Sequence, residues 1–435
     1  MILRKIFNKH LFIVLTCALI GFASFSAQAG HLVIIGGHLE QEDAAIYKEM
    51  VKLAHAHTNS KPKVCIWLTN TGVPDESYSI YSKAFNLYGA NSVEIPISSL
   101  KPKWKGNQNK LKVVKLIKKC DINFFTGGDQ SRTPSLLYNK DGSDSLALNA
   151  LRYSLNEGAV VAGSSAGDMI QSSPMITGGD SVTSLANGGK PKGMVTTSKG
   201  IGFLEPEKII LDSHFSQRGR LGRLLVALKD TNINTGVGID EATAVIANID
   251  SKGNSIGNWD IIGDNYVTIA KLSGDLKTIQ NADISILASG DKYDPNTGQI
   301  IPAPYKSKIG TSTQPYYSDD DYWSDGVFAI DSEIPYMLSR LVDSTANDIR
   351  GTSLVENTFQ KGTFADKYNA KGVEIKFSKT ALTEGYYGKP KKINPDIENA
   401  HWYTATHLKF NYRPVTISVS NDNGRTNSDS QLSSI

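Results

Sequence analysis

Residues 159–170, AVVAGSSAGDMI, indicate the fold of this chain most directly. This stretch begins with an apolar run of the length of a buried strand and ends in the apolar start of a helix. Between the two, residues 163–167 fit the G-x-S-x-G pattern, which holds a serine on a sharp turn from strand to helix. Glycines on either side let the strand and the helix pass close together. We therefore expect an exposed hydroxyl at Ser165, with an ordinary turn rich in glycine and serine as the alternative.

The same alternation of strands and helices extends along the first 160 residues. Short apolar runs predict strands, and apolar residues at helical spacing predict the helices between them. The expected strands, with the first including its turn, cover residues 31–37, 64–68, 92–97, 122–125 and 159–162. The expected helices cover residues 42–57, 78–88, 111–119 and 145–156. Such alternation is typical of an α/β domain with a mainly parallel sheet.

Beyond residue 200 the expected elements are mostly strands. They cover residues 207–211, 236–239, 243–247, 265–272, 282–288, 373–378 and 404–419, with helices at 219–229 and 334–344. The predicted organisation is a signal segment (1–29), an α/β domain with the candidate site (30–295), a loop or linker (296–325), a β-rich C-terminal extension (326–420) and a flexible tail (421–435). We expect the extension to be a packing domain; its many aromatic residues suit the alternative of binding to a granule.

The first 29 residues have the pattern of a secretory signal peptide. Arg4, Lys5 and Lys9 precede an apolar run, and an A-x-A motif ends at Ala29. Cleavage there would remove three basic residues and no acidic one, so the formal charge of +3 for the 435-residue chain would fall to zero. A near-neutral chain lacks the basic excess of a nucleic-acid-binding protein. We expect a secreted protein, extracellular or periplasmic, without a stable membrane anchor; an uncleaved anchor is the alternative.

The hydrophobic fraction and the cysteines narrow the class of protein further. A 40% hydrophobic fraction is enough for a core and excludes a disordered chain. Three cysteines are too few for a disulfide scaffold at this length. Cys65 lies in an apolar, strand-like run, so we expect Cys65 and Cys120 to be buried thiols. Export also permits a disulfide between them.

A serine nucleophile needs a base, and the base needs an acid that orients it. His214 directly follows an expected strand, where sheet folds present functional loops. Another short strand ends in Asp240 and Glu241, and either carboxylate could orient the base. The alternatives are a surface-loop histidine and an ordinary acidic turn.

Residues 126–132, TGGDQSR, also follow an expected strand. Paired glycines let backbone N–H groups approach a ligand closely. The N–H of Gly128 and that of Ala166, directly after the serine, are therefore candidates for an oxyanion hole. A plain tight turn is the alternative for the glycine pair.

Arg218, Arg220 and Arg223 cluster directly after His214. Each guanidinium can bind a carboxylate through two parallel hydrogen bonds. The cluster therefore favours recognition of a carboxylate; phosphate is less well supported because the sequence has no P-loop. A solvated basic face is the alternative. The sequence has no recognisable metal-binding motif, and we expect no metal and no cofactor.

Together, these segments resemble the cyanophycinase family. The matching pieces, in order, are VIIGG (33–37), FTGGDQ (125–130), GSSAG (163–167), DSHFSQRGRLGR (212–223) and GIDE (238–241). The resemblance covers about residues 31–295. It implies a flavodoxin-like or class I glutamine amidotransferase-like sheet and a serine-type exopeptidase related to peptidase E. The implied substrate is cyanophycin, a poly-aspartate chain with an arginine on each β-carboxyl, and the implied product is the β-Asp-Arg dipeptide.

The resemblance also implies roles for individual residues. Ser165 would be the nucleophile, His214 the general base and Glu241, rather than Asp240, the orienting acid, with Gly128 and Ala166 as oxyanion donors. The expected substrate-binding residues are Asp129, Gln130, Asp212, Ser213, Arg218, Arg220 and Arg223, among which Asp129 and Asp212 are candidate partners for the substrate's arginines. Ser213 stands where the family usually has glutamine, which puts the preference of the pocket in doubt.

Two other functions stay open from the sequence. One is a peptidase of the same family that cleaves short aspartyl or isoaspartyl peptides, and the other is an inactive exported binding protein that uses the same cleft. The expected partners are the cyanophycin polymer or β-Asp-Arg peptides, with no nucleic acid. A second copy of this chain, in a homodimer, is a further candidate partner.

Overall fold

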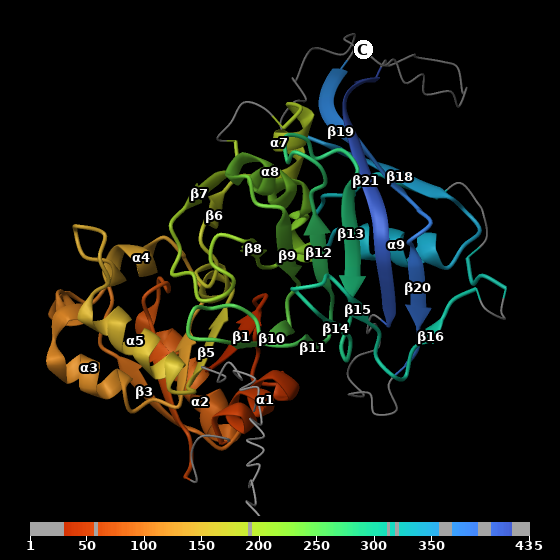
Figure 1. Cartoon of the computed structure of the whole chain (residues 1–435). Coiled ribbons are helices and arrows are strands. Elements are labelled where there is room, and N and C mark those ends of the chain that lie inside the picture. The colour runs from red at the N-terminus through yellow and green to blue at the C-terminus, as the bar shows by residue number, and fades with distance from the viewer. Residues whose placement is uncertain are drawn as a thin grey trace, which may run out of the picture.

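The computed structural model describes residues 30–55, 60–189, 194–310, 314–317, 322–355, 368–389 and 402–419. The expected signal peptide (1–29) and flexible tail (421–435) lie outside these residues and stay predictions. Figure 1 shows an α/β part built from the N-terminal residues beside a strand-rich part that contains the C-terminal residues. Within the ranges given above, no helix is both long and apolar enough to cross a membrane.

In the described chain, nine strands form a first sheet in the order β15-β14-β11-β10-β1-β5-β4-β2-β3. Its parallel half consists of β1 (Gly30–Ile35), β5 (Val160–Ser164), β4 (Ile122–Phe125), β2 (Lys63–Trp67) and β3 (Asn91–Ile95). Its antiparallel half consists of β10 (Thr243–Ile249), β11 (Trp259–Gly263), β14 (Lys292–Tyr293) and β15 (Ile300–Ile301). The α/β fold with a mainly parallel core is confirmed.

Helices cover both faces of the parallel half because its strands are apolar on both sides. Along β1, Leu32 and Ile34 belong to the core under α3 (Leu111–Ile117) and α5 (Leu146–Asn156). Val33 and Ile35 belong to the core under α1 (Ala44–His55) and α2 (Pro74–Leu87). Helix α2 begins four residues before the expected start at residue 78. Its first turn is Pro74 and two acidic residues, which favour a helix start but carry no apolar spacing.

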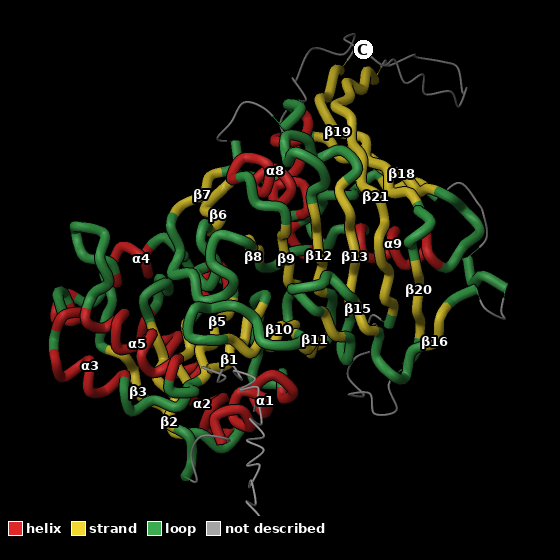
Figure 2. Tube along the Cα trace, viewed as in Figure 1, coloured by secondary structure: helices red, strands yellow, loops and turns green. Residues whose placement is uncertain are grey.

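The described residues also form a second, ten-stranded sheet, which is mostly antiparallel. Its main order is β17-β18-β19-β21-β13-β12-β9-β8, and β20 lies between β21 and β16. The strands are β8 (Ile209–Asp212), β9 (Thr235–Ile239), β12 (Val267–Lys271), β13 (Ala282–Leu287), β16 (Ser307–Lys308), β17 (Trp323–Ser324), β18 (Asp348–Leu354), β19 (Tyr368–Ser378), β20 (Glu384–Tyr387) and β21 (Tyr403–Val419). Figures 1 and 2 show β21 directly beside β13, so the C-terminal strands continue the sheet that begins at β8 and β9.

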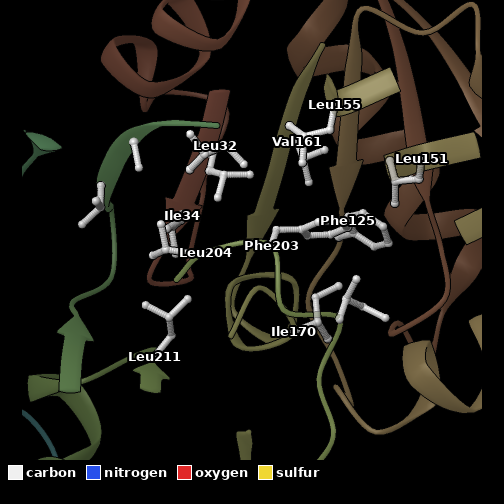
Figure 3. Close-up of a cluster of buried hydrophobic side chains, with 14 of the residues drawn as sticks. Leu32, Ile34, Phe125, Leu151, Leu155, Val161, Ile170, Phe203, Leu204 and Leu211 are labelled. Atoms are coloured by element: carbon white, nitrogen blue, oxygen red, sulfur yellow. The ribbon is translucent and has the colours of Figure 1, made fainter. Parts of the chain in front are cut away.

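The two sheets share a core. One side of β8 and β9, with Leu211 and Val237, joins the core of the first sheet, and Figure 3 shows Leu204 beside Ile34 of β1 with Leu211 nearby. The other side, with Ile210, packs against α8 (Leu221–Thr231), and the same core extends to α9 (Ile334–Val342), which packs against β18, β20 and β21. The remaining elements are α4 (Arg132–Leu137), α6 (Ala166–Met169), α7 (Ser181–Ala186), β6 (Met175–Gly178), β7 (Thr196–Ser198) and the 3-10 turns η1 (Pro102–Trp104), η2 (Asn107–Asn109) and η3 (Ser216–Arg218).

Cys65 and Cys120 are joined by a disulfide. Both are buried, as expected, but the expectation of two free thiols is wrong. The pairing follows from the sheet order. Cys120 lies just before β4, and β4 is hydrogen-bonded to β2, the strand that carries Cys65.

A buried ion pair fastens the segment after β13 to β21. Lys306 Nζ lies 2.8 Å from both carboxylate oxygens of Asp291 and 2.8 Å from Thr404 Oγ1, and the Lys306 and Asp291 side chains are fully buried. Asp291 also accepts the backbone N–H groups of Ala288 and Ala303. The described part of segment 296–325, expected to be a loop or linker, contains the three short strands β15, β16 and β17. The domain boundaries proposed from the sequence stay a prediction.

Removing the lysine of this pair should destabilise the folded protein. Lys306→Met leaves a buried carboxylate without its counter-charge, so we expect about 3 kcal/mol loss in the free energy of unfolding, measured by urea denaturation. Lys277→Met, which removes an exposed partner of Asp275, should leave the unfolding midpoint nearly unchanged. An unfolding midpoint of Lys306→Met equal to that of Lys277→Met would contradict a stabilising role for the buried pair.

Candidate active site

Ser165 occupies a strained turn between β5 and α6. Its backbone has φ 58° and ψ −111°, a conformation that residues with a side chain rarely adopt. A Cβ on Gly163 would lie 2.1 Å from the carbonyl oxygen of Gly167, and a Cβ on Gly167 would lie 2.3 Å from that of Phe125. Glycine is therefore required on both sides of the serine.

The structure brings Ser165, His214 and Glu241 into one hydrogen-bonded chain. His214 Nε2 lies 2.6 Å from Ser165 Oγ, and His214 Nδ1 lies 2.5 Å from Glu241 Oε1. The serine follows β5 of the first sheet, whereas the histidine and the glutamate follow β8 and β9 of the second. The three side chains therefore meet where the carboxyl ends of strands from the two sheets come together.

Gly36 and Gly37, at the end of β1, hold the histidine in this position. The backbone N–H of His214 donates to the carbonyl oxygen of Gly36 at 2.6 Å. Gly37 has φ +117°, and a Cβ there would lie 2.3 Å from Cε1 of the imidazole. The glycine pair thus provides both a hydrogen bond and the space for the ring.

Asp240 and Glu241 have different environments. Their residue types alone could not show which of the two carboxylates meets the histidine. Glu241 contacts the imidazole, whereas Asp240 is buried and accepts the backbone N–H groups of Ser216 at 2.8 Å and Tyr266 at 3.2 Å. Burial raises the pKa of Asp240 to about 6. Asp240 therefore supports the loop around the site, and Glu241 is the carboxylate that meets the histidine.

The surroundings of His214 lower its pKa. Burial has the largest effect because it disfavours the charged imidazolium, and the positive charge of Arg218 acts in the same direction. The hydrogen bond and negative charge of Glu241 oppose both. A lowered pKa keeps the imidazole neutral, and so able to accept a proton, at mildly acidic pH.

The glycine loop after β4 lies against the serine. A Cβ on Gly127 would be 3.3 Å from Ser165 Cβ. Asn70 holds this loop in place, because the Asp129 N–H donates to the Asn70 carbonyl oxygen at 3.0 Å. Ala166 is the first residue of α6, so its N–H has no acceptor within the helix. Ala166 and the loop that contains Gly127 therefore border Ser165, and the oxyanion role of the Gly128 and Ala166 N–H groups stays a prediction.

The expected substrate-binding residues divide into accessible and enclosed groups. Asp212 is fully buried and pairs with Arg223, whose Nε lies 2.7 Å from its Oδ2 and whose Nη2 bonds its Oδ1. Arg220 Nη1 lies 3.3 Å from Asp212 and 2.6 Å from the carbonyl oxygen of Ser213. Asp212 and Arg223 thus pair with each other in an enclosed position, and their expected contact with a substrate stays a prediction.

Arg218 is the exposed member of the arginine cluster. Gln130 is partly buried and donates from Nε2 to the carbonyl oxygen of Ile176 at 2.7 Å. Asp129 accepts the hydroxyl of Ser131, and this hydrogen bond, more than the nearby charge of Arg132, lowers its pKa. In the part of the chain that the structure describes, no group of three or more His, Cys, Asp or Glu residues could hold a metal ion.

Asp168, three residues after the serine, was not among the predicted site residues. It is fully buried, and neither carboxylate oxygen has a hydrogen-bond partner among the described residues. Burial, and to a smaller extent the negative charge of Asp212, raise its pKa well above the ordinary value. An acidic residue inside the apolar helix start at residues 166–170 was the available signal in the sequence.

Asp168 should make the protein less stable as the pH rises. A carboxyl whose pKa is raised by folding stabilises the folded state at low pH, and this is lost as the pH rises from the unfolded pKa of about 4 toward the folded pKa. Asp168→Asn cannot ionise, so its melting temperature should fall less between about pH 5 and 8 than that of the unmodified chain. The exposed Asp141→Asn should keep the original pH dependence. Parallel curves for Asp168→Asn and the unmodified chain would refute this effect.

Comparison with known proteins yields curated relatives and solved structures, but no family model matches. The chain is 34% identical over 191 residues to a cyanophycinase of Geminocystis herdmanii, covering 42% of this chain and 65% of that protein. It is 27% identical over 290 residues to a cyanophycinase of Nostoc sp., covering 63% and 89%. A cyanophycinase of Synechococcus elongatus is 29% identical over 234 residues, covering 52% and 68%.

Two solved structures have a weaker likeness. A peptidase from an acI-B1 Actinobacterium has a TM-score of 0.45 at 19% identity and covers 61% of this chain and 97% of its own. A putative peptidase E protein from Listeria monocytogenes has a TM-score of 0.32 at 15% identity and covers 56% and 99%. The sequence relatives carry the comparison: the chain is similar to cyanophycinases, and it spans 65% of the length of the one from Geminocystis herdmanii.

Proposed function

We propose that this chain is an exported serine-type exopeptidase that hydrolyses cyanophycin to β-Asp-Arg dipeptides. The observation that carries the proposal is the hydrogen-bonded chain from Ser165 through His214 to Glu241. A nucleophile, a base and an orienting acid in this order are the groups that acyl transfer needs. The strained backbone at Ser165, with φ 58°, supports the nucleophile elbow expected from the G-x-S-x-G pattern.

The mechanism has two halves. His214 Nε2 takes the hydroxyl proton of Ser165 as Oγ attacks the scissile carbonyl carbon, and Glu241 stabilises the resulting imidazolium. The N–H groups of Gly128 and Ala166 hold the negative oxygen of the tetrahedral intermediate. His214 then gives its proton to the leaving amine, which leaves an acyl-enzyme. A water molecule, deprotonated by His214, attacks the ester; the acyl fragment leaves with a new carboxylate, and His214 returns the proton to Ser165 Oγ.

The proposed substrate contacts follow from which groups are accessible. Arg218 is exposed beside His214 and would bind a free carboxylate of the aspartate backbone. Arg220 would assist from a partly buried position, held by Asp212 and the Ser213 carbonyl. Asp129 is exposed, and its carboxylate would bind the arginine of the substrate. The Cys65–Cys120 disulfide fits the oxidising compartment that an exported protein would enter.

Product analysis tests the substrate and the nucleophile together. Incubation with cyanophycin should release β-Asp-Arg, detected by mass spectrometry. Ser165→Ala should lower the rate by at least about 1,000-fold because the acyl-enzyme cannot form. The exposed Ser251→Ala should keep full activity. Release of free arginine, or turnover only of short aspartyl dipeptides, would refute the proposed substrate, and an active Ser165→Ala would refute the proposed nucleophile.

The pH profile tests the proposed base. Because the positive charge of Arg218 lowers the pKa of His214, Arg218→Gln should move the acidic limb of kcat/KM to higher pH. It should also raise KM, because the variant loses a carboxylate ligand. Arg350→Gln, a change on β18, is the matched control and should leave the profile in place. An acidic limb that stays fixed or moves to lower pH in Arg218→Gln would contradict this assignment.

A further inference from the structure

We propose that Gln217 is a positioning residue for the catalytic acid, and that residues 326–333 of the C-terminal region hold it in place. The inference rests on the proposed function, in which Glu241 orients His214. It gives the C-terminal region a role in that site that the sequence did not predict.

The loop after His214 and the turn that carries Glu241 exchange hydrogen bonds. Ser216 N–H donates to Asp240 Oδ1 at 2.8 Å, and Glu241 N–H donates to Gln217 Oε1 at 3.0 Å. Two neighbouring residues of one segment therefore bond two neighbouring residues of the other. Since Glu241 Oε1 lies 2.5 Å from the imidazole, the Gln217 side chain fixes the backbone from which that carboxylate extends.

The C-terminal region supports the same loop from its other side. Asp331 N–H donates to the Gln217 carbonyl oxygen at 3.1 Å, and Ser332 N–H donates to that of Ser216 at 2.9 Å. The approach is close at Gly219, where φ is +55° and a Cβ would lie 2.4 Å from the carbonyl oxygen of Phe328. A side chain at residue 219 would push the two segments apart.

The supporting segment is itself anchored. The Ser332 hydroxyl donates to the Val327 carbonyl oxygen at 2.6 Å and closes the turn. Phe328 N–H donates to Ser353 Oγ at 2.8 Å, and Val327 N–H donates to the Thr352 carbonyl oxygen at 3.3 Å, both on β18. A continuous set of contacts therefore runs from β18, through residues 327–332 and Gln217, to Glu241.

This arrangement makes a chemical prediction about Gln217. The site needs the side-chain oxygen of Gln217 as a hydrogen-bond acceptor, but it does not need the amide nitrogen. Gln217→Met removes the acceptor at similar length and should lower kcat by on the order of 10- to 100-fold with little change in KM, because misplacement of the acid affects the reaction more than binding. Gln217→Glu keeps an acceptor and should restore most of kcat. Its negative charge should also raise the pKa of His214 and move the acidic limb of kcat/KM to higher pH.

Two readouts separate this inference from the proposed function. One is the release of β-Asp-Arg from cyanophycin, and the other is the rate at which a fluorophosphonate acylates Ser165, which needs no polymer. In that labelling step Ser165 Oγ bonds phosphorus, fluoride leaves and His214 accepts the hydroxyl proton. Slow labelling of Gln217→Met and recovery in Gln217→Glu would support the inference even if cyanophycin is not the substrate. A chain that is neither labelled nor active would overturn both.

A second variant tests the support that the C-terminal region gives to the loop after His214. Ser332→Ala opens the turn at residues 327–332 and should lower kcat and the labelling rate in the same direction as Gln217→Met, at unchanged KM. The exposed Ser307→Ala, in the same region, is the matched control and should behave as the unmodified chain. The inference is overturned if Gln217→Met is labelled at the original rate, or if Gln217→Glu loses as much kcat as Gln217→Met. It is also overturned if Ser332→Ala keeps full kcat.

Discussion

The short turn formed by residues 240–242 carries the chain from one sheet to the other, and the geometry of the candidate site depends on it. Before the turn, β9 belongs to the second sheet; after it, β10 belongs to the first. The buried carboxylate of Asp240 bonds the loop after β8 and the start of β12, while Glu241 meets His214. An acidic pair that ends a strand thus divides two tasks, one structural and one chemical.

The meeting of two sheets explains why the C-terminal residues matter to the site. The two strands that carry His214 and Glu241, β8 and β9, lie at one end of the second sheet. The interior of that sheet is completed by β13 and β21, and the Asp291–Lys306 pair joins their ends. The C-terminal strands therefore support the sheet from which two of the three residues of the proposed triad extend.

Charge in this protein is organised locally. The arginines after His214 are neither a uniform basic face nor three equivalent ligands. Asp212 neutralises Arg223 in the interior and partly neutralises Arg220, so Arg218 is the exposed charge beside the imidazole. The same positive charge lowers the pKa of His214, which links the proposed carboxylate site to the protonation state of the proposed base.

Sequence patterns were sufficient to predict the parallel α/β core, the glycine-flanked Ser165 and the histidine that follows β8, because each is a local pattern with its own periodicity or turn chemistry. Local sequence patterns could not predict that Asp240 and Glu241 have different environments. They also did not predict the disulfide or the burial of Asp212. The patterns also gave no signal for Gln217, whose side chain accepts the N–H of Glu241 24 residues away, or for residues 326–333, whose backbone hydrogen bonds join segments more than 100 residues apart. These features depend on the folded chain, because tertiary packing determines which segments of two different sheets come within hydrogen-bonding distance.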